Sequence, residues 1–168
     1  MGFPAMKKFL VPFVALLLLA GLWFSLLLPE RAPQAQLALL DGKILQLSDL
    51  KGKVVLVNFW ATSCPSCVKE MPGMAATYQD YRDQGFETVA IAMSYDPPTH
   101  VLNFVQKNGL PFPVALDADG GAAQAFGNIM VTPTSFMLDQ DGKIVKRILG
   151  EIQFPELHAE LDKLLGTR

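Results

Sequence analysis

Residues 52–72, GKVVLVNFWATSCPSCVKEMP, combine a strand pattern, a helix pattern and two cysteines. The first part, residues 54–60, is a nearly continuous apolar run rich in β-branched residues, which is typical of a strand buried on both faces. From Pro65 to about Gln84 the hydrophobic residues recur at helical spacing, and Gly85 provides a stop signal. The stretch therefore predicts a central strand that leads directly into a long helix, with two cysteines at the junction.

The chain on both sides of this unit alternates between strand and helix patterns. Two pairs of strands flank Asp41-Gly42 and Asp141-Gly142, dipeptides that are typical of tight hairpin turns. We expect strands at 37–40, 43–47, 86–93, 134–138 and 143–149, helices at 99–108 and 122–126, and a final amphipathic helix with Phe154, Leu157, Leu161, Leu164 and Leu165 on one face. These elements predict an α/β domain with a mixed central sheet.

An apolar segment at residues 9–28 precedes the domain and is hydrophobic at all but three of its positions. A helix of that length spans about 30 Å, the thickness of a bilayer's hydrocarbon core. Lys7 and Lys8 lie just before it, so the positive-inside rule keeps the N-terminus in the cytoplasm and exports the rest. A cleaved signal peptide is the alternative, although no A-x-A-like site lies between Ser25 and Ala38.

The expected organisation follows from this segment. We predict a cytoplasmic N-terminus at 1–8, a transmembrane anchor at 9–28, a polar tether at 29–36 and one exported domain at 37–168. The chain is 51% hydrophobic and 18% charged, and the excess apolar content lies in the anchor, which excludes a disordered chain and a multispan membrane protein. A net charge of −2 without basic clusters excludes a nucleic-acid partner.

Cys64 and Cys67 are the only cysteines and form a C-x-x-C motif at the strand–helix junction. The dipole and free N–H groups of a helix N-terminus favour an anion, which predicts a lowered pKa and a nucleophilic role for Cys64. Cys67 lies one turn further and would close the disulfide as the resolving thiol. Pro65 suits the first helical position. The pattern predicts a redox-active pair.

Two other roles for the cysteines fit less well. A structural disulfide that closes so short a loop would restrict the unfolded chain little. A zinc site would need two more ligands, and His100 and His158 lie in separate expected helices, where we expect them to be exposed. We therefore expect no metal and no cofactor.

The same stretch, residues 52–72, resembles the signature of membrane-tethered bacterial thiol-disulfide oxidoreductases of the TlpA/ResA type. Asp41-Gly42-Lys43 with residues 47–50 resembles that family's added N-terminal hairpin, and Thr132-Pro133-Thr134 with residues 139–143 resembles its C-terminal half. The resemblance covers about residues 37–165 and implies a thioredoxin-like fold with an added N-terminal β-hairpin.

The resemblance also implies roles for individual residues. Pro133 corresponds to a cis-proline that faces the disulfide and keeps metals off the thiols, and Thr132 would offer its backbone to a substrate peptide. Glu70 matches a glutamate that could accept a proton during exchange, although an exposed first-turn glutamate would also suit the helix dipole. Trp60 and Pro65 border the active-site turn, where we expect them at the substrate-binding surface, although for Trp60 the resemblance favours packing over chemistry.

Two positions depart from related patterns. Asn58 lies where thioredoxins proper carry a buried aspartate, so Glu70 becomes the remaining candidate proton acceptor. Ser63 lies where the family usually has tryptophan directly before the first cysteine, which would open the site to partners.

The resemblance implies a periplasmic reductant, held in the bacterial inner membrane by a single span. Its partners would be disulfide-bearing exported proteins, such as apocytochrome c or a copper-site cysteine pair, and a membrane electron donor of the DsbD/CcdA type. Two alternatives share the fold. A peroxiredoxin-type thiol peroxidase would carry threonine where this chain has Ala61, and a Sco-like copper-binding metallochaperone would need C-x-x-x-C and a late histidine ligand.

Overall fold

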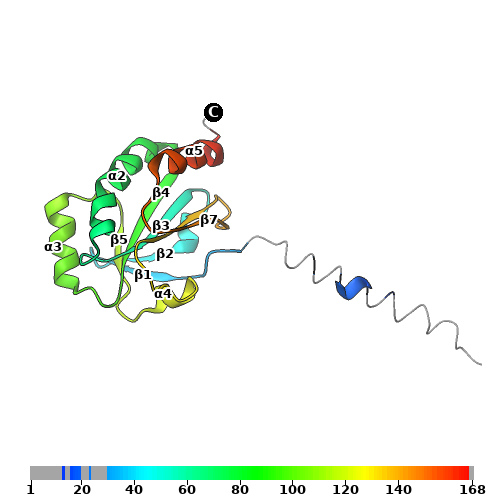
Figure 1. Ribbon diagram of the computed structural model, residues 1–168, viewed down its shortest axis with the longest axis horizontal. Helices are drawn as coiled ribbons and strands as arrows, with labels where there is room; N and C mark the ends of the chain where they lie inside the picture. Colours follow the sequence, from blue (N-terminus) through cyan, green and yellow to red (C-terminus); the bar gives the residue numbers. More distant parts are fainter. Residues whose placement is uncertain (1–12, 14–15, 20–22, 24–29, 167–168) are drawn as a thin grey trace, which may run out of the picture. The chain divides into compact units, whose positions relative to one another are not determined.

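A seven-stranded sheet forms the centre of the domain in the computed structural model, which describes residues 13, 16–19, 23 and 30–166 (Figure 1). The strand order is β2-β1-β5-β4-β3-β6-β7. The elements are β1 (Gln36–Leu39), β2 (Ile44–Gln46), the 3-10 helix η1 (Leu47–Leu50), β3 (Val54–Trp60), α2 (Pro65–Tyr81), η2 (Arg82–Gln84), β4 (Phe86–Ala92), α3 (Pro98–Asn108), β5 (Val114–Leu116), α4 (Gly121–Ala125), β6 (Thr134–Leu138), β7 (Ile144–Leu149) and α5 (Phe154–Leu165).

The strand that leads to the cysteines is β3, an interior strand of the sheet, and all seven of its residues are buried. It pairs in parallel with β4 and antiparallel with β6, so the predicted mixed sheet is confirmed. The chain leaves β3 after Trp60 and enters α2 at Pro65, as residues 52–72 predict. The cysteine loop therefore lies at the carboxyl end of β3, beside the carboxyl end of its parallel neighbour β4.

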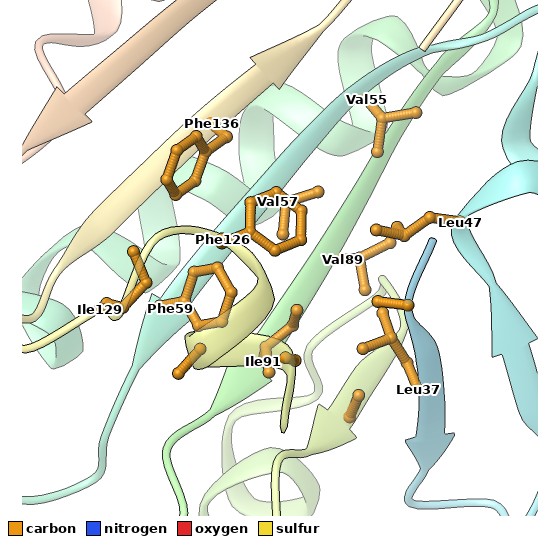
Figure 2. Close-up of a cluster of buried hydrophobic side chains, with 14 of the residues drawn as sticks. Leu37, Leu47, Val55, Val57, Phe59, Val89, Ile91, Phe126, Ile129 and Phe136 are labelled. Carbon is orange, nitrogen blue, oxygen red and sulfur yellow. The ribbon is translucent and has the colours of Figure 1, made fainter. Parts of the chain in front are cut away.

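Helices cover both faces of the sheet. One face packs against α2, α3 and α5 through a cluster that includes Leu56, Trp60, Met71, Val101 and Leu161. The other face packs against α4 through a cluster that includes Leu37, Val57, Phe59, Phe126 and Phe136 (Figure 2). Two cores of this kind match an α/β sandwich.

Strand alternation decides which side chains lie beneath the cysteine helix. In β3, Val55, Val57 and Phe59 belong to the cluster under α4, whereas Leu56 and Trp60 belong to the cluster under α2. Since successive side chains point to opposite faces, Asn58 lies on the α2 face. Its register partner in β6 is Ser135, which alternates in the same way with Phe136. Two polar residues are therefore buried together under α2.

The N-terminal hairpin is confirmed: β1 and β2 pair antiparallel around the turn that contains Gly42, whose φ is +84°. The hairpin joins the sheet because β1 pairs with β5, a strand that the sequence patterns did not predict. At three residues, β5 is too short to show a period, although it continues the sheet beside β4.

The domain begins before the expected boundary at residue 37. Arg31 forms an isolated bridge with Lys143, and the Ala32 N–H donates to Gly142 O at 2.9 Å. Most of the predicted anchor lies outside the described residues. Within the described part of the chain, no helix is both long and apolar enough to cross a membrane.

Candidate active site

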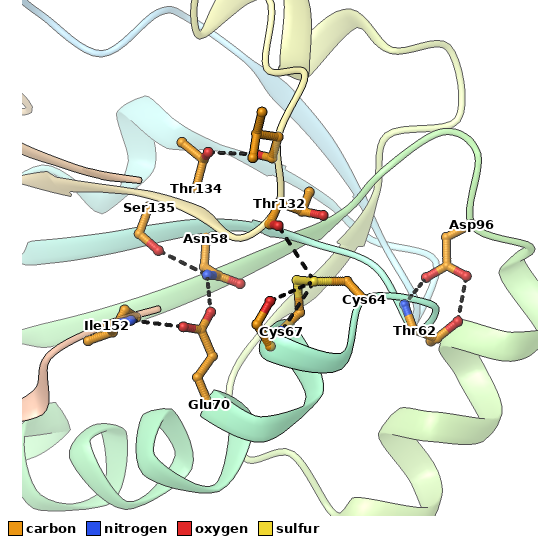
Figure 3. The surroundings of a disulfide bond; sticks show 12 residues. Asn58, Thr62, Cys64, Cys67, Glu70, Asp96, Thr132, Thr134, Ser135 and Ile152 are labelled. Atoms are coloured by element: carbon orange, nitrogen blue, oxygen red, sulfur yellow. Dashed lines mark hydrogen bonds between the residues drawn. A yellow bond between two sulfur atoms is a disulfide. The ribbon is translucent and has the colours of Figure 1, made fainter. Parts of the chain in front are cut away.

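Cys64 is the N-cap residue of α2, and Pro65 follows it in the first turn of the helix. Its Sγ accepts a hydrogen bond from the Cys67 N–H at 3.2 Å (Figure 3). A disulfide joins the two cysteines, whose Cα atoms lie 5.3 Å apart. The pair therefore occupies the helix N-terminus that the sequence predicts.

The two sulfur-bearing residues differ in exposure. Cys67 is fully buried, whereas Cys64 is partly exposed beside the exposed Ser63 and Pro65. The unpaired N–H groups of the first helical turn point toward Cys64, so a thiolate formed there after reduction would be stabilised by the helix. Ser66 Oγ lies 3.4 Å from Cys64 Sγ and is a second polar neighbour. Only Cys64 can be approached directly by a large partner.

The loop before β6 lies against the disulfide. The Thr132–Pro133 peptide bond is cis, as the resemblance implies. Thr132 O lies 3.6 Å from Cys64 Sγ, and Pro133 is buried. The structure thus brings Thr132 and Pro133 to the cysteine pair from a position far along the chain.

Apolar side chains are exposed next to this loop. Met130 is 89% exposed, Val131 62% and Tyr95 60%. The Tyr95 hydroxyl lies 3.3 Å from Thr132 Oγ1, which places the ring at the edge of the site. An open hollow of about 570 Å³ adjoins Met130, with Ile129 among its lining residues. We call Tyr95, Met130 and Val131 the apolar rim.

A buried polar network lies beneath the cysteine helix. Asn58 Nδ2 donates to Glu70 Oε1 and to Ser135 Oγ, both at 2.9 Å. Glu70 Oε2 accepts from the Ile152 N–H at 3.1 Å. Glu70 is only 3% exposed, so of the two environments considered for it, the buried one is found. Asn58 Oδ1 is buried with no hydrogen-bond partner among the described residues.

Burial raises the pKa of Glu70 above its ordinary value. The hydrogen bonds from the Ile152 N–H and from Asn58 act in the opposite direction because they stabilise the carboxylate, and the nearby charge of Glu151 adds to the increase. The net direction is upward. A carboxyl group with a raised pKa, one turn after Cys67, holds a proton more readily than an exposed glutamate does, which suits it to proton exchange.

Asp96 is a residue of this site that the sequence patterns did not indicate. It is 4% exposed, and its carboxylate accepts hydrogen bonds from the N–H and the hydroxyl of Thr62, two positions before Cys64. The available signal was its place just after β4, because the carboxyl ends of parallel strands meet at one edge of a sheet.

Two expected side-chain environments need correction. Trp60 is fully buried and packs against Phe104, with ring centroids 5.2 Å apart, so we do not propose it as a substrate contact. His158 is half-buried and shares a 2.9 Å hydrogen bond with Thr77 Oγ1, because α5 packs against α2; His100 is exposed as expected.

The site carries few of the groups that a thiol peroxidase or a copper-binding protein would need. Ala61, at the position where a peroxidase would carry a threonine, is fully buried and has no hydroxyl. Among the described residues, no group of three or more His, Cys, Asp or Glu side chains could hold a metal ion. The arrangement around Cys64 is suited to dithiol–disulfide exchange.

Comparison with known proteins agrees with this chemistry. The family model described as Redoxin matches residues 29–164. The chain is 41% identical over 135 residues to the thiol-disulfide oxidoreductase ResA of Bacillus thuringiensis strain Al Hakam, which covers 80% of this chain and 77% of that protein. It is 39% identical over 127 residues to ResA of Bacillus subtilis strain 168, over 76% of this chain and 70% of that protein.

The fold is similar to solved structures as well. A thiol:disulfide interchange protein of the thioredoxin family from Chlorobium tepidum TLS aligns with a TM-score of 0.75 and 31% identity. The alignment covers 83% of this chain and 98% of that one. The α/β architecture around the cysteine pair is therefore thioredoxin-like.

Proposed function

The chain belongs to the Redoxin family and is a ResA-like thiol-disulfide oxidoreductase, and from this premise we propose that it reduces disulfides in exported proteins. The observation that carries the proposal is the difference between the two cysteines: Cys64 is partly exposed at a helix N-terminus, and Cys67 is buried one turn further along α2. An exposed attacking thiol and a shielded resolving thiol are what reduction of a protein disulfide requires.

The reaction proceeds in two exchange steps. The Cys64 thiolate attacks one sulfur of the substrate disulfide, which forms a mixed disulfide and releases the other substrate sulfur as a thiolate. Cys67 then loses its proton and attacks Cys64 Sγ, which closes the Cys64–Cys67 disulfide and releases the second substrate thiolate. Two electrons pass from the protein dithiol to the substrate, so a donor must reduce the pair again.

Neighbouring residues assist these steps. Glu70 accepts the proton that Cys67 loses, in keeping with its burial and raised pKa. The Thr132 carbonyl lies 3.6 Å from Cys64 Sγ and offers backbone hydrogen bonding to an incoming peptide, while Pro133 shields the thiols from metals. Pro65 borders the same opening.

The substrate is an exposed, extended segment of polypeptide. The apolar rim of Tyr95, Met130 and Val131 gives such a segment apolar surface to bury beside Cys64. By the family resemblance, apocytochrome c or a copper-site cysteine pair is the substrate.

The protein works in the periplasm, anchored in the inner membrane by residues 9–28 with residues 1–8 in the cytoplasm. A reductant in an oxidising compartment needs a continuing supply of electrons, because its cysteines otherwise rest as a disulfide. Anchoring places the domain beside a membrane donor of the DsbD/CcdA type.

Trapping of substrates tests the proposal. In the full chain with Cys67→Ser, the mixed disulfide on Cys64 cannot be resolved, and we expect disulfide-linked exported proteins that mass spectrometry can identify. With Cys64→Ser as the matched control, the remaining buried cysteine should trap none. Equal trapping by both variants would contradict the assignment of roles.

The reduction potential tests the direction of electron flow. Equilibration of the Cys64–Cys67 pair with glutathione should give a clearly more reducing potential than the roughly −120 mV of the oxidant DsbA. A value near that of DsbA would overturn the reductant proposal while leaving the exchange chemistry intact.

A further inference from the structure

The loop that connects β4 to α3 contacts both of the other loops of the site, through Asp96 to Thr62 and through Tyr95 to Thr132. Its residues Tyr95 and Asp96 are adjacent in the chain but differ sharply in exposure, at 60% and 4%. The Asp96 N–H donates to Met93 O at 2.9 Å, which forms a turn directly after β4. The turn directs one side chain toward solvent and the next toward the interior.

The Asp96 carboxylate holds the loop that carries Cys64. Its Oδ2 accepts from the Thr62 N–H at 2.5 Å, and its Oδ1 accepts from the Thr62 hydroxyl at 2.6 Å. The Cys64 N–H in turn donates to Ala61 O at 3.1 Å. Thr62 is therefore inside the turn that ends at Cys64, and both of its donors are fixed by one side chain (Figure 3).

The carboxylate is buried without a cation. Among the described residues, no lysine, arginine or histidine forms an ion pair with Asp96. Burial of an ionised group is costly unless hydrogen bonds compensate for the lost water, and the two bonds to Thr62 supply that compensation. The same loop also contacts the cis-proline loop, since Tyr95 Oη lies 3.3 Å from Thr132 Oγ1.

Reduction of the disulfide changes what holds Cys64 in place. In the oxidised protein the bond to Cys67 fixes Sγ. In the reduced protein that restraint is gone, and the turn from Ala61 to Cys64 must keep the sulfur at the N-terminus of α2. The stabilisation of a thiolate by a helix is confined to the first turn, so a displaced sulfur would lose it.

We propose that Asp96 is a positioning residue for dithiol–disulfide exchange: through Thr62 it keeps Cys64 at the N-terminus of α2 when the disulfide is open. The role applies to exchange in either direction, and it does not depend on the identity of the substrate.

Variants of the full-length chain separate positioning from charge. Asp96→Ala removes both hydrogen bonds, and Thr62→Val removes the bond made by the hydroxyl. Asp96→Asn keeps the shape and can still accept from the Thr62 N–H while its amide donates to the Thr62 oxygen, so it removes mainly the charge. Asp117→Ala is the matched control, because Asp117 is also 4% exposed and accepts two backbone N–H bonds, from Ala122 and Ala123.

The readout is the reaction of reduced Cys64 with a small alkylating reagent, together with the thiolate absorbance as a function of pH. We expect Asp96→Ala to slow alkylation at neutral pH by about tenfold, because a small displacement of a reacting group has effects of this size or larger. Thr62→Val should be slowed less, Asp96→Asn should stay close to the unmodified chain, and Asp117→Ala should lose stability without a change at Cys64.

Two results would overturn the proposal. If Asp96→Asn and Asp96→Ala both increased the thiolate fraction and Thr62→Val did not change it, Asp96 would act through its negative charge alone. If alkylation were unchanged in Asp96→Ala and Thr62→Val, the contact would be purely structural. Should Asp96→Ala fail to fold, Thr62→Val and Asp96→Asn still decide between these outcomes.

Discussion

Asn58 Nδ2 donates a hydrogen bond to Glu70 Oε1 at 2.9 Å, across the interface between β3 and the cysteine helix α2. Asn58 gives its second amide hydrogen to Ser135, so in this arrangement the amide stabilises the ionised form of Glu70. Asn58 Oδ1 meanwhile has no partner among the described residues. Rotation of the amide would present this oxygen to a protonated Glu70, so the network can serve both protonation states.

Glu70→Gln tests the proton acceptor. The raised pKa of Glu70 means that its carboxylate loses accepting capacity as the pH falls through that value, so exchange by the unmodified chain should slow toward acidic pH. We expect the variant to be slower near neutral pH by at least about tenfold, since general acid–base catalysis contributes 10² or more. In the variant, the decrease in exchange rate toward acidic pH that is attributed to Glu70 should be absent. Exchange with a small disulfide across a pH series measures both effects.

Glu87→Gln is the matched control for that experiment. Glu87 is also buried, at 8% exposed, but it pairs with Lys53 and lies beside Val55 near the start of β3, whereas the cysteines follow the end of that strand. Its pH–rate profile should match that of the unmodified chain. Superimposable profiles for Glu70→Gln as well would assign Glu70 a structural role.

Asn58→Asp tests the need for an amide at this position. The substitution places a second carboxylate beside Glu70, and mutual repulsion with burial raises the pKa of the pair above the unfolded values of about 3.9 and 4.3. As the pH rises, these two carboxyl groups therefore lose their protons at a lower pH in the unfolded chain than in the folded chain, which favours unfolding. Stability should match the unmodified chain most closely below about pH 4 and fall progressively above it, with a deficit of about 3 kcal/mol at neutral pH.

The double variant with Asn58→Asp and Glu70→Gln should recover most of that deficit, because only one carboxylate remains in the network. Urea unfolding at several pH values measures the free energy of unfolding of the single and the double variant. A deficit that is independent of pH, or that the second substitution does not relieve, would show that repulsion between the two carboxylates is not the cause.

Local patterns predicted the elements whose periodicity is strong. The run VVLVNFW at residues 54–60 matches β3 residue for residue, and Gly85 ends the helical region with a φ of +96°. The three-residue strand β5 was missed because so short an apolar run carries no period. Its identity as a strand depends on pairing with β4 and β1, which lie far from it in sequence.

Some residues of the site could likewise be predicted from local patterns, and others could not. Cys64 and Pro65 could be placed from the sequence because a helix N-terminus is a local feature. The burial of Glu70 could not, since it depends on Ile152, 82 residues away, and Asp96 reaches Thr62 across 34 residues. Contacts of this kind follow from the sheet order and not from any nearby pattern.

Gly73→Ala tests the packing of the cysteine helix against α5. Alanine normally favours a helix over glycine by about 1 kcal/mol. A Cβ at Gly73 would, however, overlap the Phe154 ring, so we expect the substitution to destabilise the domain by about 1–3 kcal/mol instead. Thermal or urea unfolding measures the change.

Two further variants help to interpret the effect of Gly73→Ala. Adding Phe154→Leu should relieve the overlap, so the double variant should be more stable than the sum of the single changes predicts. Gln79→Ala, at an exposed position of the same helix, should change stability by less than about 0.5 kcal/mol. A stabilising effect of Gly73→Ala alone would show that α5 can move away from α2 at little cost.

Removal of residues 1–30 tests the anchor. Both hydrophobic cores lie at or beyond Ala35, and Arg31 and Ala32 already pair with the β6–β7 hairpin, so residues 31–168 should fold and unfold cooperatively. This shortened chain should be recovered from the aqueous fraction with its exchange activity retained.

The full chain should remain with the membrane fraction until detergent is added, because twenty largely apolar residues can span the bilayer. Intact mass distinguishes the two possibilities for the segment: an anchor leaves residues 9–28 on the exported protein, whereas loss of that mass together with release from the membrane would show a cleaved signal peptide.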